Sequence, residues 1–338
     1  MRDGTRDGTR DGTRDGMRDG SRFSFVDLAP GEESFRDAVL NGLARPSKAI
    51  PCKFFYDARG SALFEEICRL PEYYPTRTEI AILEENAGEI AAQMGPHCRI
   101  IEFGSGASDK ARILLRALDR PAAYVPVDIS REHLRQAALS LAGDFPELPV
   151  IAVCADYTRP FAVPPLSGPS GKRVGFFPGS TIGNFEPDSA RRFLANCAHI
   201  LGSGGEMLIG ADLKKEPRIL EAAYNDRAGV TAAFNLNLLV RINRELDGDL
   251  DLDLFEHVAM YNETEGRVEI YIRSRADQWA TIAGRPFAFT AGELIHTEYS
   301  YKYAVPEFRA LAATAGFRPV DTWTDPGELF SVHYFRLR

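Results

Sequence analysis

The chain has 338 residues, of which 44% are hydrophobic and 26% charged, and a net charge of −8, a composition typical of a folded enzyme with one large or two ordinary domains. The acidic charge argues against a nucleic-acid partner, and neither a membrane-length apolar run nor the apolar core of a secretory signal is present. The five cysteines are widely spaced and form no C-x-x-C pair, which favours a reduced, cytoplasmic protein over a disulfide framework or a zinc site.

The N-terminal segment differs in composition from the rest of the chain. Residues 1–22 repeat a tetrapeptide of Arg, Asp, Gly and Thr with almost nothing to bury, so we expect a disordered tail. Further along, an aromatic-rich segment contains a predicted helix around Ser61–Arg69. The letters TRTE at Thr76–Glu79 are typical of a capping box, and the apolar residues behind them keep helical spacing as far as Met94.

From residue 98 onward, short apolar strands alternate with amphipathic helices. The predicted strands are 98–103, 123–128, 150–156, 173–178 and 206–212. This alternation predicts a mostly parallel sheet with helices on both faces, which binds ligands at the carboxyl ends of its strands. Residues 214–265 are predicted to be mainly helical, and strand character returns in RVEIYIRS, IHTEYSYKY and FSVHYFRLR. We therefore expect an α/β, doubly wound sheet that a second unit interrupts.

A glycine turn follows the first of these strands. Gly104-Ser105-Gly106 lets the backbone approach a ligand, and Ser108 can cap the helix that follows. The next two strands end in Asp128 and Asp156, where a carboxylate can bind a ribose diol or face an adenine amino group. An NAD-dependent oxidoreductase would share these features, but the third glycine of G-x-G-x-x-G is missing. A noncatalytic nucleoside-binding protein is a further alternative.

Four longer stretches carry a more specific resemblance. The segments FYDARGSALFEEICRLPEYYPTRTE, EFGSGASDK, FFPGSTIGNFEP and AAYNDRAGVTAAFNLNLL together resemble the S-adenosylmethionine-dependent histidine Nα-methyltransferases of ergothioneine biosynthesis, over roughly residues 25–338. The resemblance implies transfer of three methyl groups from S-adenosylmethionine to the α-amino group of L-histidine, which gives hercynine. It also implies a Rossmann-like methyltransferase domain, 78–213 with 303–338, and a substrate-binding α+β domain, 23–77 with 214–302.

The resemblance assigns site residues one by one. Those matched to the cofactor are Gly104, Lys110, Asp128 for the ribose, and the pair Asp156 and Tyr157 that flanks the adenine. Those matched to the substrate are Asn184, Tyr224 for its carboxylate, Tyr73, Glu298 and Ser300 for its imidazole, and Ile270 as pocket lining. Tyr56 and Gly179 are expected to close around the amino group. The nucleophile must be a neutral amine, and Tyr56 is the candidate that positions it.

The strand IHTEYSYKY combines several of these candidates. Strict alternation puts His296, Glu298, Ser300 and Lys302 on one face. Glu298 and Ser300 can then reach one ring, which a carboxylate and a hydroxyl would pair with at both nitrogens. Tryptophan is a weaker alternative substrate, because its indole offers one donor and no acceptor. His296 and Lys302 receive no role.

The remaining expectations concern partners. We expect L-histidine as the small-molecule substrate, S-adenosylmethionine as the methyl donor and no metal. No nucleic acid or membrane is expected to bind, and a monomer is the predicted state.

Overall fold

The computed structural model describes residues 14–15, 22–29, 34–106, 109–165 and 171–338. Most of the repeat tail, for which we expected disorder, lies outside these residues, and so does Ser108, the expected helix cap. Within the tail, strand β1 (Arg14–Asp15) pairs with strand β2 (Phe23–Asp27).

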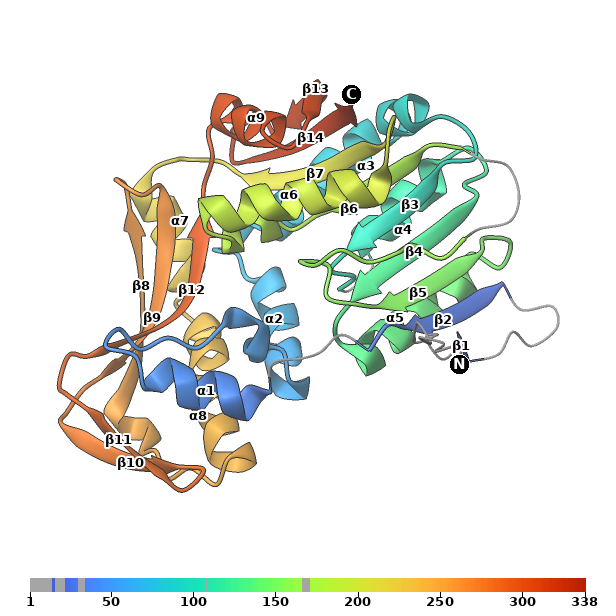
Figure 1. The fold of residues 1–338 in the computed structure, drawn as a ribbon. Coiled ribbons are helices and arrows are strands. Elements are labelled where there is room, and N and C mark those ends of the chain that lie inside the picture. Colours follow the sequence, from blue (N-terminus) through green and yellow to red (C-terminus); the bar gives the residue numbers. More distant parts are fainter. Residues whose placement is uncertain (1–13, 16–21, 30–33, 107–108, 166–170) are drawn as a thin grey trace, which may run out of the picture.

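A nine-stranded sheet forms the larger part of the molecule (Figure 1). Its order is β1-β2-β5-β4-β3-β6-β7-β14-β13. Strands β2 to β7 are parallel, and β14 and β13 extend the sheet in antiparallel fashion. Their bounds are β3 Arg99–Phe103, β4 Ala123–Asp128, β5 Val150–Cys154, β6 Arg173–Phe177, β7 Glu206–Asp212, β13 Phe317–Thr324 and β14 Phe330–Leu337. The doubly wound α/β sheet expected from the sequence is confirmed.

Helices cover both faces of this sheet. One apolar core joins it to α3 (Tyr74–Met94), α4 (Asp109–Ala117) and α5 (Arg131–Asp144). A second core, on the other face, joins it to α6 (Pro187–Leu201) and α9 (Val305–Ala313). Because both faces are buried, the parallel strands read as continuous apolar runs in the sequence.

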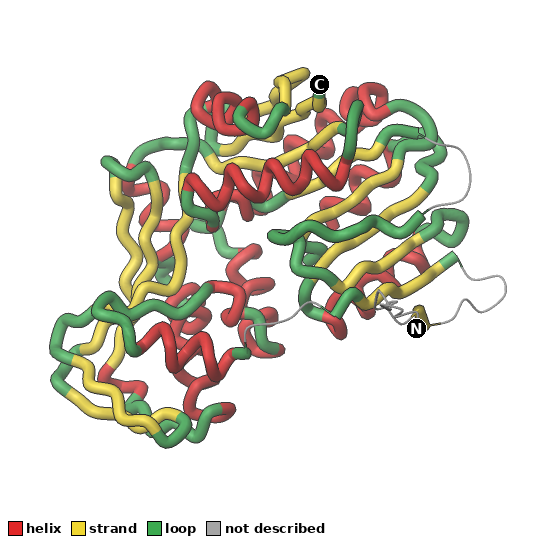
Figure 2. Tube along the Cα trace, in the orientation of Figure 1, coloured by secondary structure: helices red, strands yellow, loops and turns green. Residues whose placement is uncertain are grey.

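A smaller unit of helices and antiparallel strands lies beside the large sheet (Figure 2). Its three-stranded sheet has the order β12-β9-β8, and a separate hairpin pairs β10 with β11. The strands are β8 Phe255–Asn262, β9 Arg267–Ser274, β10 Gln278–Ile282, β11 Arg285–Phe289 and β12 Leu294–Tyr301. The helices are α1 Phe35–Leu43, α2 Ala58–Arg69, α7 Pro217–Tyr224 and α8 Val230–Glu245, and the 3₁₀ turns of the chain are η1 Cys52–Phe55, η2 Thr181–Asn184 and η3 Leu252–Leu254.

Two expectations about the elements are wrong. Helix α3 begins at Tyr74 with Pro75 in its first turn, so TRTE lies inside the helix and is not a capping box. Proline is favoured at that position because its missing N–H would have no helical partner. The segment 214–265, expected to be mainly helical, contains α7, α8 and η3, and it also contains the whole of strand β8. Strand β2 pairs with β5 in the large sheet, although the sequence assigned 23–77 to the substrate-binding unit.

Candidate active site

The carboxyl ends of β3, β4 and β5 are followed or formed by Gly104, Asp128, and Asp156 with Tyr157, which the sequence matches to the cofactor. Gly104 has φ +75°, and a Cβ there would lie 3.5 Å from the Tyr157 hydroxyl oxygen, so the turn favours glycine. The N–H of Gly104 donates to the Val127 carbonyl at 2.8 Å, which fixes the turn against β4. Asp128 ends β4, and burial raises the pKa of its carboxyl to about 6. Beyond β5, the Tyr157 ring packs against Phe103 and two further aromatic rings.

Lys110 and Gly179 meet at one carboxylate that the sequence analysis did not single out. Glu79 Oε2 lies 2.5 Å from Lys110 Nζ and accepts a hydrogen bond from the Gly179 N–H at 2.8 Å. The Glu79 side chain is 1% exposed. It packs against Gly210, where a Cβ would lie 2.1 Å from Glu79 Oε1. The sequence feature that could have pointed to Glu79 is its position as an acidic residue on the apolar face of helix α3.

A pocket between the smaller unit's helices and strands contains the substrate candidates. It is a partly open pocket, and the roughly 400 Å³ between its walls that no atom fills includes open solvent. The predicted residues that line it are Tyr56, Tyr73, Tyr224, Ile270 and Glu298. The others are Phe55, Phe64, Ile67, Thr231, Phe234 and Asn235. Ser300 joins the site through its hydroxyl, which lies 2.8 Å from that of Tyr224. Asn184 and Gly179 are not among the lining residues; Asn184 ends the 3₁₀ turn η2 and Gly179 shortly precedes it.

Glu298 is the carboxylate among the described residues that line this pocket. It lies opposite Ile270 across the β12–β9 pair. Among the residues that the structure describes, no side chain or backbone group donates a hydrogen bond to its carboxylate. Burial raises the pKa of Glu298 to about 7, and the nearby Lys302 ammonium partly opposes this rise. A desolvated carboxylate without a donor can accept a hydrogen bond from a ligand.

Tyr56 lies at the open side of the same pocket. Its residue is 46% exposed, and its ring meets those of Phe64 and Phe234 edge-on, each at 5.6 Å. Helix α2 begins directly after it, where Asp57 accepts a hydrogen bond from the Gly60 N–H at 2.8 Å. A Cβ on Gly60 would lie 1.7 Å from the Phe55 carbonyl oxygen. The close approach of η1 to α2 therefore fixes the backbone on either side of Tyr56.

The expected placement of His296 is wrong. The β12–β9 register shifts between His296 and Glu298, so a β-bulge interrupts the alternation. His296 consequently packs on the opposite face, with its ring centroid 3.9 Å from that of Tyr299 and 5.5 Å from that of Tyr271. Thr297 sits at the bulge and donates to the Ile270 carbonyl at 3.1 Å. Alternation alone gives no signal for such a bulge.

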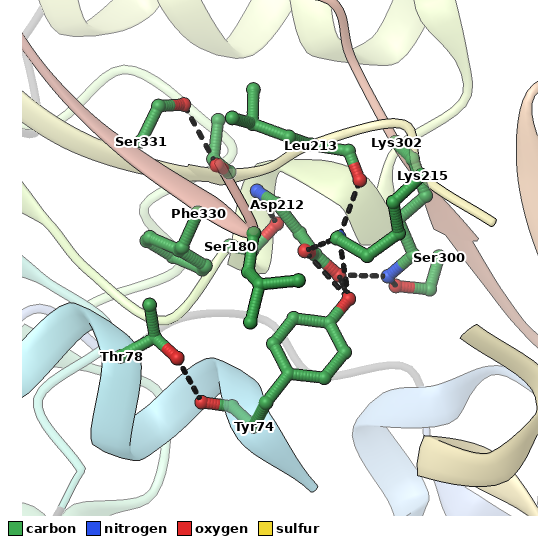
Figure 3. Close-up of polar contacts among 12 residues, drawn as sticks. Tyr74, Thr78, Ser180, Asp212, Leu213, Lys215, Ser300, Lys302, Phe330 and Ser331 are labelled. Atoms are coloured by element: carbon green, nitrogen blue, oxygen red, sulfur yellow. Dashed lines mark hydrogen bonds and ion pairs between the residues drawn. The ribbon is translucent and has the colours of Figure 1, made fainter. Parts of the chain in front are cut away.

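Lys302 belongs to a buried polar cluster that links the two sheets (Figure 3). Its Nζ lies 2.8 Å from Asp212 Oδ2, at the end of β7, and its side chain is 0% exposed. The same ammonium group donates to the hydroxyls of Ser300 at 2.8 Å and Tyr224 at 2.9 Å. The other described partners of the Asp212 carboxylate are the Tyr74 hydroxyl at 2.8 Å and Lys215 Nζ at 2.6 Å.

Comparisons with known proteins identify the family of this chain. Residues 35–337 match the family described as histidine-specific methyltransferase, SAM-dependent. The chain belongs to this family. It is therefore an S-adenosylmethionine-dependent methyltransferase, and the resemblance seen in the sequence is confirmed. Among the described residues of this methyltransferase, no helix is long and apolar enough to cross a membrane.

Three curated relatives of the methyltransferase are similar over most of its length. A histidine N-alpha-methyltransferase of Mycolicibacterium smegmatis is 42% identical over 89% of this chain and 94% of its own. One of Mycobacterium tuberculosis is 39% identical with the same coverage. Ergothioneine biosynthesis protein 1 of Neurospora crassa is 33% identical over 85% of this chain, which matches 33% of that longer protein.

Proposed function

We propose that this methyltransferase transfers three methyl groups from S-adenosylmethionine to the α-amino group of L-histidine and so makes hercynine, an early step of ergothioneine biosynthesis. The names of the relatives support this substrate. The observation that carries it furthest is the Glu298 carboxylate, which faces the pocket with no donor among the described residues.

The imidazole ring is the part of histidine that such a carboxylate recognises. Glu298 accepts a hydrogen bond from one ring nitrogen, and the Ser300 hydroxyl pairs with the other. The ring edges pack against Ile270 and the aromatic wall. An apolar competitor leaves the buried carboxylate without a donor, which costs about 1–3 kcal/mol. An indole leaves the second polar group unpaired, since it has one donor and no acceptor.

The strand ends of the large sheet fit the methyl donor. In this proposal Gly104 and Lys110 hold its amino-acid part, Asp128 its ribose, and Asp156 with Tyr157 its adenine. The Asp128 carboxyl, whose pKa burial raises to about 6, is a group that two ribose hydroxyl donors would stabilise in its charged form. Gly104 has a left-handed φ, which favours glycine, so no side chain occupies this position of the turn. Bound there, S-adenosylmethionine supplies a methyl group on a positively charged sulfur.

The amine end of histidine is assigned to the residues between the two sites. Asn184 and Tyr224 bind the carboxylate, Tyr73 contacts the imidazole end, and Tyr56 with Gly179 closes around the amino group. The amine must lose its proton before it can attack, and Tyr56, at the open side of the pocket, orients it while the proton leaves to solvent. The smaller unit with its helices is the substrate-binding part of the enzyme in this account, and β2 belongs to the cofactor-binding sheet.

Product analysis tests the proposal. The enzyme is incubated with S-adenosylmethionine and, separately, with histidine, tryptophan and a histidine-containing dipeptide, and the products are weighed by mass spectrometry. Three successive methyl additions on histidine alone support the proposal. Methylation of tryptophan in preference to histidine contradicts it. The monomeric state and the cytoplasmic location stay predictions.

A further inference from the structure

Lys302 uses all of its N–H donors in hydrogen bonds within the protein, so none remains for a ligand. Its ammonium group has three N–H donors. The acceptors are Asp212 Oδ2, the Tyr224 hydroxyl oxygen and the Ser300 hydroxyl oxygen, at 2.8, 2.9 and 2.8 Å. Burial opposes the charged form, but the Asp212 carboxylate outweighs it and raises the pKa of Lys302 above its ordinary value. Lys302 is therefore a fixed, charged donor.

These bonds restrict what the two hydroxyls can offer a ligand. Tyr224 and Ser300 also share a hydrogen bond of 2.8 Å, in which one of them donates. Each oxygen accepts from Lys302 as well, so the donor of that pair keeps one free lone pair and the acceptor keeps one free hydrogen. One hydroxyl can then only accept from the substrate, and the other can only donate. A Tyr224 that binds the substrate carboxylate must be the donating one, which leaves the Ser300 oxygen to accept from a ring N–H.

The charge of Lys302 also acts on the ring-binding side of the pocket. Ser300 is two residues from Lys302, and Glu298 two residues further along the same strand. Lys302 is the cation that counteracts the burial of Glu298. Among the described residues, the Glu298 charge also acts on Cys52, Tyr56 and Tyr73, and desolvation raises the pKa of all three, to about 12 for Cys52. None of them supplies a positive charge.

We propose that Lys302 is a positioning residue for histidine recognition: it holds the hydroxyls of Ser300 and Tyr224 as a complementary donor and acceptor and supplies the positive charge that steadies the Glu298 carboxylate. This inference rests on the proposed function, because it concerns the same pocket. It gives a role to a residue that the strand pattern left without one.

Lys215 provides a matched control. Its Nζ contacts Asp212 Oδ1 at 2.6 Å and the Tyr74 hydroxyl at 2.7 Å, and its contacts do not include Tyr224 or Ser300. Burial lowers the pKa of Lys215 to about 8. Removing either lysine leaves Asp212 with one ammonium group and with Tyr74. The variants Lys302→Met and Lys215→Met therefore disturb the same carboxylate, but only the first frees the two hydroxyls.

Steady-state kinetics with histidine separate the two variants. We expect Lys302→Met to raise the KM for histidine about tenfold or more and Lys215→Met to change it less than about twofold, because a lost charged hydrogen bond is worth about 1.5–3 kcal/mol. Binding of S-adenosylmethionine is expected to change less than about threefold in both. Equal KM changes in the two variants would overturn the proposal.

The pH dependence of kcat/KM for histidine distinguishes the proposed role of Lys302 from a purely structural role, which would not change it. We expect the acid limb of kcat/KM for histidine to move up by about one pH unit in Lys302→Met, since Glu298 loses its opposing charge. The histidine amine contributes equally to every variant, so it cancels in the comparison. The shift should vanish when Lys302→Met is made in the Glu298→Gln background. A shift of the same size in that background, or none in either, would contradict the role.

A second substitution covers the case in which Lys302→Met does not fold. Lys302→Arg keeps the charge but not the compact three-way geometry. We expect its acid limb to stay at the wild-type pH and its KM for histidine to rise at least about fivefold. A wild-type KM in Lys302→Arg would count against positioning. If the wild-type enzyme does not methylate histidine at all, the proposed function fails. The KM and pH results of the Lys302 variants, by contrast, test only the role of Lys302.

Discussion

Glu298 and Ile270 face each other across neighbouring strands, as a directly paired position of β12 and β9. The pair places a carboxylate that lacks a donor beside an apolar side chain that is 4% exposed. This combination suits a flat polar ring, because the ring nitrogens require hydrogen bonds and the ring carbon atoms require apolar contact.

Ile270→Ala should loosen this site without removing its polar group. We expect kcat/KM for histidine to fall about tenfold and the preference for histidine over tryptophan to shrink, because the space left by the side chain weakens packing and admits a larger ring. Competition between the two amino acids, followed by product mass, measures the preference. An unchanged preference would mean that Ile270 does not shape the ring site.

Glu298 should make the ligand-free enzyme less stable at alkaline pH. Its folded-state pKa of about 7 lies above the ordinary 4.5, so its favourable contribution is complete below pH 4.5 and is lost as the pH rises through 7. Relative to wild type, Glu298→Gln should therefore gain about 1–3 kcal/mol of unfolding free energy between pH 5 and pH 8. Denaturant unfolding at both pH values tests this, and parallel curves for the two proteins would refute it.

Tyr56→Phe tests the assignment of the amine-positioning group. If the hydroxyl orients the amine, we expect kcat to fall about 10- to 100-fold with little change in binding of S-adenosylmethionine. The phenylalanine ring keeps the edge-on contacts with Phe64 and Phe234, so the fold is preserved. A rate and pH profile equal to those of the wild type would remove Tyr56 from the mechanism.

Gly210→Ala tests whether the buried Glu79 carboxylate organises the cofactor edge. The added Cβ would lie 2.1 Å from Glu79 Oε1 and push it away from Lys110 and Gly179. We expect a loss of about 1–3 kcal/mol of stability and weaker binding of S-adenosylmethionine. Gly88→Ala is the control: it lies in the same helix as Glu79 with open space around its Cβ position, and should stabilise by about 0.5–1 kcal/mol. Thermal melts of both variants decide between these outcomes.

The parallel strands and the glycine turn were predictable because local patterns determine them. Each buried strand is a short apolar run, and the candidate site residue stands at its end or just beyond it, as Asp128 ends β4. The bulge at Thr297 was not predictable, because it depends on pairing with β9 and on backbone bonds of His296 to Lys48 and Ile50.

Long-range contacts explain the polar residues that sequence reasoning missed. Asp212 was seen only as the last residue of a strand, and Glu79 as part of a supposed capping box. Their roles arise from partners far along the chain: Lys302 for Asp212, and Lys110 with Gly179 for Glu79. The residue pattern within a single helix or strand does not predict contacts between residues so far apart in the sequence.

Glu298→Ala offers the most direct test of how this enzyme selects its substrate. The measurement is the ratio of kcat/KM for histidine to that for tryptophan, together with the affinity for S-adenosylmethionine, in wild type and variant. Removing the ring acceptor should lower the ratio about 10- to 100-fold, equivalent to about 1–3 kcal/mol, and change the cofactor affinity less than about threefold. An unchanged ratio, or an equal loss of cofactor binding, would contradict the claim that Glu298 recognises the imidazole ring.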